Sequence, residues 1–196
     1  MNQRPIGVFD SGLGGLTAVR QLRRLMPSEN IIYFGDTARV PYGNRSRDTL
    51  LKYARQDMGF LRGFDLKAVV IACGTVSTNC LEDLQAECSI PVIGVVEPGS
   101  AAAARVSVGG RICVIATEAT IRSKAYQEAI LRRRPDAVVT GRPCTLFVPL
   151  AEEGWMDGPL VEGIAARYLD DVFGSRAPVP RPDTLLLGCT HFPLLK

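Results

Sequence analysis

The chain has 196 residues, of which 46% are hydrophobic and 22% charged, and a formal net charge of +3. This composition is ordinary for a globular protein with a substantial core, and the charge is too small to indicate a nucleic-acid partner. No apolar stretch is long enough to span a bilayer, so we expect no membrane partner. The densest basic run, 132–134, is expected to complement the C-terminus of a helix.

Seven short runs rich in Val, Ile and Leu lie along the chain, mostly without alternation, which is typical of parallel strands covered on both faces. Between them, apolar residues recur at the spacing of amphipathic helices. The expected strands cover 6–9, 31–34, 68–72, 92–95, 112–116, 137–140 and 184–187, and the expected helices cover 16–25, 48–62, 79–87, 99–106, 121–133 and 160–173. This alternation predicts an α/β fold with doubly wound parallel sheets.

A weak internal repeat divides the chain. Residues 6–11 open the first half, residues 112–117 open the second, and each half later reaches a strand that is followed by a cysteine. We therefore expect two pseudosymmetric α/β domains, 1–97 and 98–196. The active site is expected in the cleft between them, where α/β proteins bind ligands.

The ends of the chain and its thiols bear on its location. A strand begins at Ile6, so we expect no signal peptide, and the six cysteines show no short spacing framework for disulfides. Both features favour a cytoplasmic protein with reduced thiols. The chain stops at Lys196, seven residues after Cys189, where a helix is expected to begin. We therefore expect that a C-terminal segment is missing.

Two cysteines occupy matching local settings. Cys73 and Cys189 each follow an apolar strand and come shortly before a threonine, at the expected start of a helix. The positive end of a helix lowers the pKa of a thiol from about 8.5, and free N–H groups there can hold a carboxylate. Such a pair suits symmetric chemistry, in which one thiol removes a proton from one face of a substrate and the other delivers a proton to the opposite face.

Rival uses of these residues explain less. His191, the only histidine, lies two residues after Cys189 and either exchanges a proton with it or is structural. A zinc site needs three or four ligands, which no C-x-x-C or second histidine supplies nearby, so we expect no metal. A Cys–His hydrolase would leave the second thiol motif unexplained. A thioredoxin-like site would need C-x-x-C.

Two loops are ambiguous from the sequence. The glycine-rich segment 10–15 follows the first strand, but its third glycine is wrongly spaced for a dinucleotide site. Asp10 either caps this tight turn or points into the cleft and tunes a neighbouring group. Residues 41–43, Pro-Tyr-Gly, form an ordinary turn after Asp36 unless the preceding strand ends at the same cleft.

Assembled, these residues resemble the glutamate racemases of the aspartate/glutamate racemase superfamily. The matching segments occur in family order and cover the chain from end to end. They are 9–15 (FDSGLGG), 33–36 (YFGD), 41–43 (PYG), 73–75 (CGT), 116–123 (ATEATIRS), 147–154 (FVPLAEEG) and 187–193 (LGCTHFP).

The resemblance implies a cofactor-independent isomerase that interconverts L- and D-glutamate. It implies that this enzyme supplies D-glutamate for peptidoglycan, and hence for cell-wall biogenesis and cell shape. It also implies a homodimer. It implies Cys73 and Cys189 as the two acid/base residues, with Asp10, Glu152 and His191 assisting them. It implies substrate contacts at Asp10, Ser11, Tyr42, Gly43, Gly74, Thr75, Thr190 and His191.

Gly74 departs from the family, which usually carries Asn after the first cysteine, so a side-chain amide is missing near the expected substrate. Two alternatives stay open. One is a related two-thiol isomerase acting on aspartate, a hydantoin or maleate, and the other is a non-catalytic member that binds an amino acid and regulates a partner. Thr117, Thr120 and Ser123 are the candidates for holding the side-chain carboxylate of glutamate.

Overall fold

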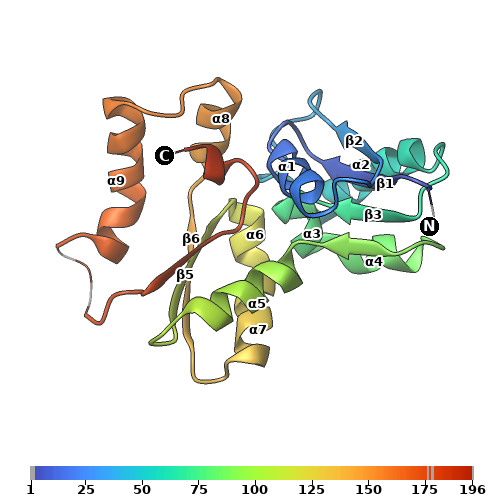
Figure 1. Cartoon of the computed structure of the whole chain (residues 1–196). Coiled ribbons are helices and arrows are strands. Elements are labelled where there is room, and N and C mark those ends of the chain that lie inside the picture. The colour runs from blue at the N-terminus through green and yellow to red at the C-terminus, as the bar shows by residue number, and fades with distance from the viewer. Residues whose placement is uncertain (1–2, 176, 178, 196) are drawn as a thin grey trace.

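The computed structural model describes residues 3–175, 177 and 179–195 and contains two parallel sheets (Figure 1). The first has the order β2-β1-β3-β4 and the second β6-β5-β7, and every strand pairing is parallel. The strands are β1 (Ile6–Asp10), β2 (Ile31–Gly35), β3 (Ala68–Ile71), β4 (Val92–Gly94), β5 (Arg111–Ala116), β6 (Val138–Pro143) and β7 (Thr184–Leu187). The expected α/β fold with parallel sheets is confirmed.

Helices connect successive strands in both sheets. They are α1 (Leu16–Leu25), α2 (Arg47–Leu61), α3 (Gly74–Asn79), α4 (Leu81–Ala86), α5 (Val96–Val106), α6 (Glu118–Ser123), α7 (Ala125–Arg133), α8 (Phe147–Glu152), α9 (Pro159–Phe173) and the 3-10 turn η1 (Phe192–Leu194).

Both faces of the first sheet are covered, as its continuous apolar strands require. Phe9 and Ile71 pack on one face with Leu50 of α2. Val8 packs on the other face with Val19 of α1. The β1 and β3 strands run toward the second sheet (Figure 1), so the loops that follow them lie at the junction of the two sheets.

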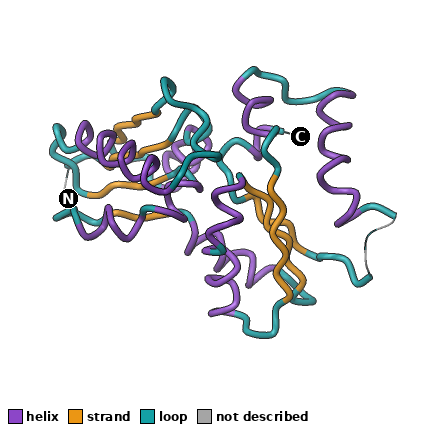
Figure 2. The backbone as a smooth tube through the Cα atoms, turned by 180° about the vertical axis from the view of Figure 1, so that it is seen from behind, coloured by secondary structure: helices purple, strands orange, loops and turns teal. Residues whose placement is uncertain are grey.

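The second sheet repeats this plan. Cys113 and Ile115 of β5 pack with residues of α8 and α9, whereas Ile112 and Val114 pack with residues of α5 and α7. Figure 2 accordingly shows α9 on the opposite side of this sheet from α5 and α7. The division into domains 1–97 and 98–196 stays a prediction; its boundary lies within the first turn of α5, and its outer ends, Met1 and Lys196, lie outside the described residues.

Several expected helices differ from those observed. The helix expected over 121–133 is two helices, α6 and α7, because Lys124 has a left-handed backbone (φ 59°). The helix expected over 79–87 corresponds to α4. It is preceded by a further helix, α3, which begins directly after Cys73, and Cys80 lies between α3 and α4. Helix α8 was not expected from the sequence, since its six residues are too short for a clear apolar period.

The basic run is used within the fold. Arg132 lies 2.7 Å from Glu97 and Arg133 pairs with the same carboxylate, while Arg134 donates to the backbone carbonyl of Ser107. Within the described part of the chain, no helix is both long and apolar enough to cross a membrane.

Candidate active site

Cys73 lies at the junction of the two sheets. It follows β3, serves as the N-cap residue of α3 and is 4% exposed. Its sulfur lies 3.4 Å from the hydroxyl oxygen of Ser11, which follows β1. The carboxyl ends of two adjacent parallel strands therefore bring Cys73 and Ser11 together, as parallel-sheet geometry dictates.

Cys189 follows β7 in the second sheet and is also buried. Its sulfur lies 3.6 Å from Nδ1 of His191, and Nε2 of that ring lies 2.5 Å from Glu152 Oε1. This network assigns the ring proton to Nε2, where the carboxylate accepts it, and leaves Nδ1 to accept the thiol proton. The Glu152–His191 pair is therefore placed to exchange a proton with Cys189.

Asp10 joins the two halves of the site. Its Oδ2 accepts hydrogen bonds from the backbone N–H groups of Gly12 (3.1 Å) and Gly15 (2.9 Å), so it caps the glycine-rich turn. Its Oδ1 accepts a hydrogen bond from the Thr190 hydroxyl at 3.3 Å. The interpretation of Asp10 as the cap of this turn is therefore confirmed, and its role beside a substrate stays a prediction. Burial raises the pKa of Asp10, and the charge of His191 acts in the opposite direction.

The expectation that helix N-termini depress the thiol pKa values is wrong. Burial, followed by the charge of Asp10, raises the pKa of Cys73 to about 11, although the Ser11 hydroxyl and backbone N–H groups act against the shift. Burial also raises the pKa of Cys189, against backbone N–H groups of His191 and Phe192. Desolvation of the thiolate outweighs the dipole of a single short helical turn. Both thiols are therefore protonated at neutral pH.

Cys189 lies in the electrostatic environment of Cys73. The proximity of Cys73 and of Asp10 contributes to the raised pKa of Cys189. The pKa of Tyr126 is raised by burial and by both thiols. Gly74 also lies against the backbone of Gly188, and Thr190 donates a hydrogen bond to Asp10, so the two thiol motifs and one buried carboxylate lie in one region of the junction.

A cluster of threonine hydroxyls spans the same junction. The Thr75 oxygen lies 2.9 Å from that of Thr117, which donates to Thr120 at 3.0 Å. Thr117 and Thr120 were expected near the substrate, and both are in this cluster. Ser123 is not, because its hydroxyl donates to the Thr120 backbone carbonyl within α6 at 2.7 Å.

Tyr42 and Gly43 stand on a loop that reaches the second sheet. The Gly43 carbonyl accepts a hydrogen bond from the Ala119 N–H at 3.0 Å. The Tyr42 hydroxyl donates into a buried pair of carboxylates, Asp36 and Asp57, instead of facing the thiols. The Tyr42 hydroxyl is therefore engaged within the protein, and the expected substrate contact of Tyr42 stays a prediction.

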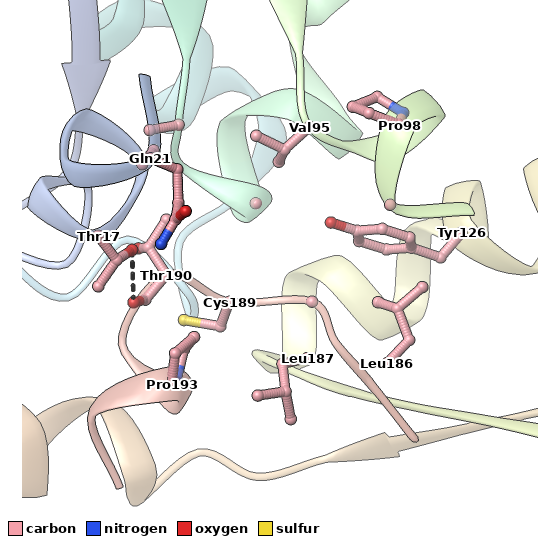
Figure 3. A pocket seen from close by; sticks show the side chains of 15 residues that line it. Thr17, Gln21, Val95, Pro98, Tyr126, Leu186, Leu187, Cys189, Thr190 and Pro193 are labelled. Atoms are coloured by element: carbon pink, nitrogen blue, oxygen red, sulfur yellow. Dashed lines mark hydrogen bonds between the residues drawn. The ribbon is translucent and has the colours of Figure 1, made fainter. Parts of the chain in front are cut away.

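Gly74 lies against the backbone of Gly188, which leaves no room for a side chain at residue 74. Beside this contact is a cavity of about 440 Å³, part of whose lining Figure 3 labels. Cys189, Thr190 and Pro193 lie on one side of it and Tyr126 and Pro98 on another (Figure 3). Gly74, not Cys73, represents the first thiol motif in this lining.

Sequence reasoning missed three supporting residues. Tyr33 donates to the Gly12 carbonyl at 2.5 Å and holds the glycine-rich turn. Thr17 donates to the Thr190 carbonyl at 3.3 Å, a contact visible in Figure 3. Tyr126 lines the cavity from α7. Tyr33 and Thr17 are distant in sequence from their hydrogen-bond partners, so no local pattern predicts these contacts.

Comparison with known proteins places the chain in a family. The family described as Asp/Glu/Hydantoin racemase matches residues 17–196. The glutamate racemase of Geobacter metallireducens is 51% identical over 196 residues, which are 100% of this chain and 71% of that protein. The crystal structure of a glutamate racemase from Francisella tularensis, in complex with D-glutamate, has a TM-score of 0.90 at 43% identity and covers 100% of this chain and 72% of that one. A glutamate racemase isoform from Bacillus anthracis has a TM-score of 0.93 at 38% identity, covering 100% of this chain and 71% of its own. The chain therefore belongs to the aspartate/glutamate/hydantoin racemase family.

Proposed function

We propose that the chain is a cofactor-independent glutamate racemase that interconverts L- and D-glutamate with two thiols. The observation that carries the proposal is the backbone contact between Gly74 and Gly188, which brings together, beside Asp10, the ends of the two strands that precede Cys73 and Cys189. The relatives named glutamate racemase, one of them in complex with D-glutamate, support glutamate as the substrate.

The chemistry requires removal of a weakly acidic Cα proton. One cysteine, as thiolate, takes this proton, and the other, as thiol, delivers a proton to the opposite face, so the protonation states of the two sulfurs are exchanged after each turnover. Charge on the substrate must be stabilised by fixed dipoles in a site from which water is excluded. Each 1.4 kcal/mol or so of such stabilisation is worth about tenfold in rate.

The two thiols receive different help. Beside Cys189, His191 accepts and returns the thiol proton through Nδ1, and Glu152 holds the ring and stabilises its charged form. Beside Cys73, Ser11 and backbone N–H groups stabilise the thiolate, and Asp10 is the nearby carboxylate. The raised pKa values make each thiolate a strong base once it forms.

The substrate contacts follow from the polar groups that surround the thiols. The hydroxyls of Thr75, Thr117 and Thr120 form the candidate site for one carboxylate of glutamate. Thr190, the backbone of Gly43 and the N–H of Gly74 are the further candidate contacts. The missing amide at residue 74 leaves the backbone to bind there, which weakens binding without abolishing it.

A circular-dichroism assay tests the reaction. The protein is expected to racemise L- and D-glutamate, and Cys73→Ser and Cys189→Ser are each expected to slow Cα–H exchange from one enantiomer more than from the other. Parent-rate racemisation by both Cys73→Ala and Cys189→Ala proteins would rule the mechanism out. Activity on aspartate alone would favour the related isomerase, and binding without turnover would favour the regulatory member.

The remaining parts of the proposal concern assembly and setting. We infer a homodimer in the cytoplasm that supplies D-glutamate for peptidoglycan, on the basis of the family to which the chain belongs. Light scattering coupled to size-exclusion chromatography measures the assembly, and a mass of one chain would contradict the dimer. Restoration of growth in a D-glutamate-requiring bacterium would support the cellular role.

A further inference from the structure

A buried ionic cluster lies beneath the loop that carries Tyr42. Asp57 of α2 and Asp36, which follows β2, are 1% and 5% exposed. Arg39 bridges them, with Nη2 2.6 Å from Asp57 Oδ1 and Nε 2.5 Å from Asp36 Oδ2. Its guanidinium also lies 4.4 Å from the centroid of the Tyr53 ring. Two carboxylates can share this buried space because one cation neutralises part of their charge.

The Tyr42 hydroxyl completes the cluster. It donates toward Asp57 Oδ2 at 2.9 Å and toward Asp36. A phenol has one hydrogen, so the two carboxylates share a single donor. Asp57 is thus the residue of α2 that binds both Arg39, by a salt bridge, and Tyr42, by a hydrogen bond.

The contact between Asp57 and Tyr42 is linked to the candidate site through Gly43. Gly43 follows Tyr42, and its carbonyl accepts from Ala119 N–H of α6 at 3.0 Å. A Cβ on Gly43 would lie 2.6 Å from Cβ of Thr117, so the loop and the threonine cluster are in direct contact. A shift of Tyr42 therefore moves the loop that separates α2 from the threonine cluster.

We propose that Asp57 is a positioning residue, which holds the Tyr42–Gly43 backbone against Thr117 and so sets the substrate-binding geometry. The proposal rests on the proposed function of this site. Asp57 contacts Arg39 and Tyr42 and acts through them. The sequence indicates this loop through the Pro-Tyr-Gly segment 41–43. Nothing in the local pattern around Asp57 distinguishes Asp57 from the surface acids of α2.

Asp57 changes charge within a usable pH range. Burial raises its pKa to about 6, against the hydrogen bond from Tyr42 and the charge of Arg39. The titratable and charged groups that face it are Asp36, Arg39 and Tyr42. The ionised form accepts from both Arg39 and Tyr42, and protonation weakens its pairing with Arg39. Loop positioning is therefore expected to weaken as the pH falls below about 6.

The test compares Asp57→Asn with Asp48→Asn, which removes an exposed acid from the first turn of the same helix. Since hydrogen bonds to charged groups are stronger than those between neutral groups, Asp57→Asn is expected to raise KM for glutamate about tenfold or more, with kcat changed by less than about threefold. The parent KM should rise as the pH falls through 6, and this dependence should be absent in Asp57→Asn. Asp48→Asn should match the parent in both measurements.

A second variant covers the case in which Asp57→Asn does not fold. Tyr42→Phe removes the shared donor and should raise KM in the same way, and the double variant should be no worse than the poorer single one, because both act through one network. Lower thermal stability with unchanged KM and an unchanged pH profile would overturn the proposal. A parent protein that does not racemise glutamate overturns the proposed function and, with it, the role of Asp57. An active parent with unaffected variants refutes the role of Asp57 alone.

Discussion

Gly74 and Gly188 meet backbone to backbone across the two sheets, and a Cβ added to Gly74 would lie 2.2 Å from the Gly188 carbonyl oxygen. Carbon and oxygen atoms do not approach so closely without a bond, so the backbone of one half would have to move. These two residues directly neighbour Cys73 and Cys189. The separation of the two thiols is therefore coupled to the absence of a side chain at residue 74.

Gly74→Ala is expected to lower kcat/KM by roughly 100-fold, since a displacement of about 1 Å in a site of this kind has that cost. Gly163→Ala is the control, because Gly163 lies inside α9 and the added Cβ would meet nothing within 4 Å beyond its chain neighbours and the backbone of its own helix. The control should keep full activity and gain about 0.5–1 kcal/mol in unfolding free energy. Steady-state kinetics and denaturant unfolding measure both effects. Full activity of Gly74→Ala would show that the halves separate freely.

Glu152→Gln is expected to slow proton transfer at Cys189 by at least about tenfold, because it removes the charge from the hydrogen bond to His191. Transfer at Cys73 should change less, so deuterium exchange at Cα, begun separately from L- and D-glutamate, should be slowed unequally. The neighbouring exposed acid provides the control, and Glu153→Gln should behave as the parent. Equal slowing from both enantiomers would count against a local role for Glu152.

Alkylation should report the raised thiol pKa values. The thiolate is the form that reacts with iodoacetamide, and the pKa of Cys73 is raised to about 11. At pH 7, the half-buried Cys88 should be labelled before Cys73 and Cys189. Because a raised pKa delays ionisation, labelling of Cys73 should accelerate by about tenfold per pH unit above neutrality. Peptide mass spectrometry measures the order, and rapid labelling of Cys73 at pH 7 would contradict it.

Thr117→Val is expected to affect both stability and substrate binding. The Thr117 hydroxyl accepts from the Thr120 N–H at the start of α6, and loss of such a cap costs about 1 kcal/mol. The same change removes the central hydroxyl of the threonine cluster, so KM for glutamate should rise. Thr117→Ser retains the hydroxyl and should restore both properties. A normal KM in the valine protein would exclude this cluster from the substrate site.

The sequence was sufficient to predict the α/β class and the placement of both thiols, because these depend on local patterns. Continuous Val/Ile/Leu runs mark buried parallel strands, and a cysteine directly after such a run must lie at the carboxyl edge of a sheet. His191 could be associated with Cys189 for the same reason, since only Thr190 lies between them. The pairing of Cys189 with His191 at 3.6 Å agrees with this expectation.

Features that depend on tertiary burial could not be read in this way. The direction of the Cys73 pKa shift follows from desolvation, which requires the packed structure, whereas the sequence reveals only the helix start. The Tyr42 side chain turns toward Asp57, fifteen residues away, and no local period marks that contact. The break at Lys124 is equally invisible, because an apolar helical pattern continues across it.

The unequal surroundings of Cys73 and Cys189 cannot change the equilibrium between the two enantiomers. Mirror-image forms of a free amino acid have identical free energies in water, so their equilibrium ratio is one whatever protein interconverts them. The values of kcat/KM for the two directions must then be equal, even though one thiol has a Glu152–His191 pair and the other a serine. If the site is asymmetric, kcat and KM must differ between the two directions by the same factor. The direction with the higher kcat therefore saturates at a proportionally higher substrate concentration.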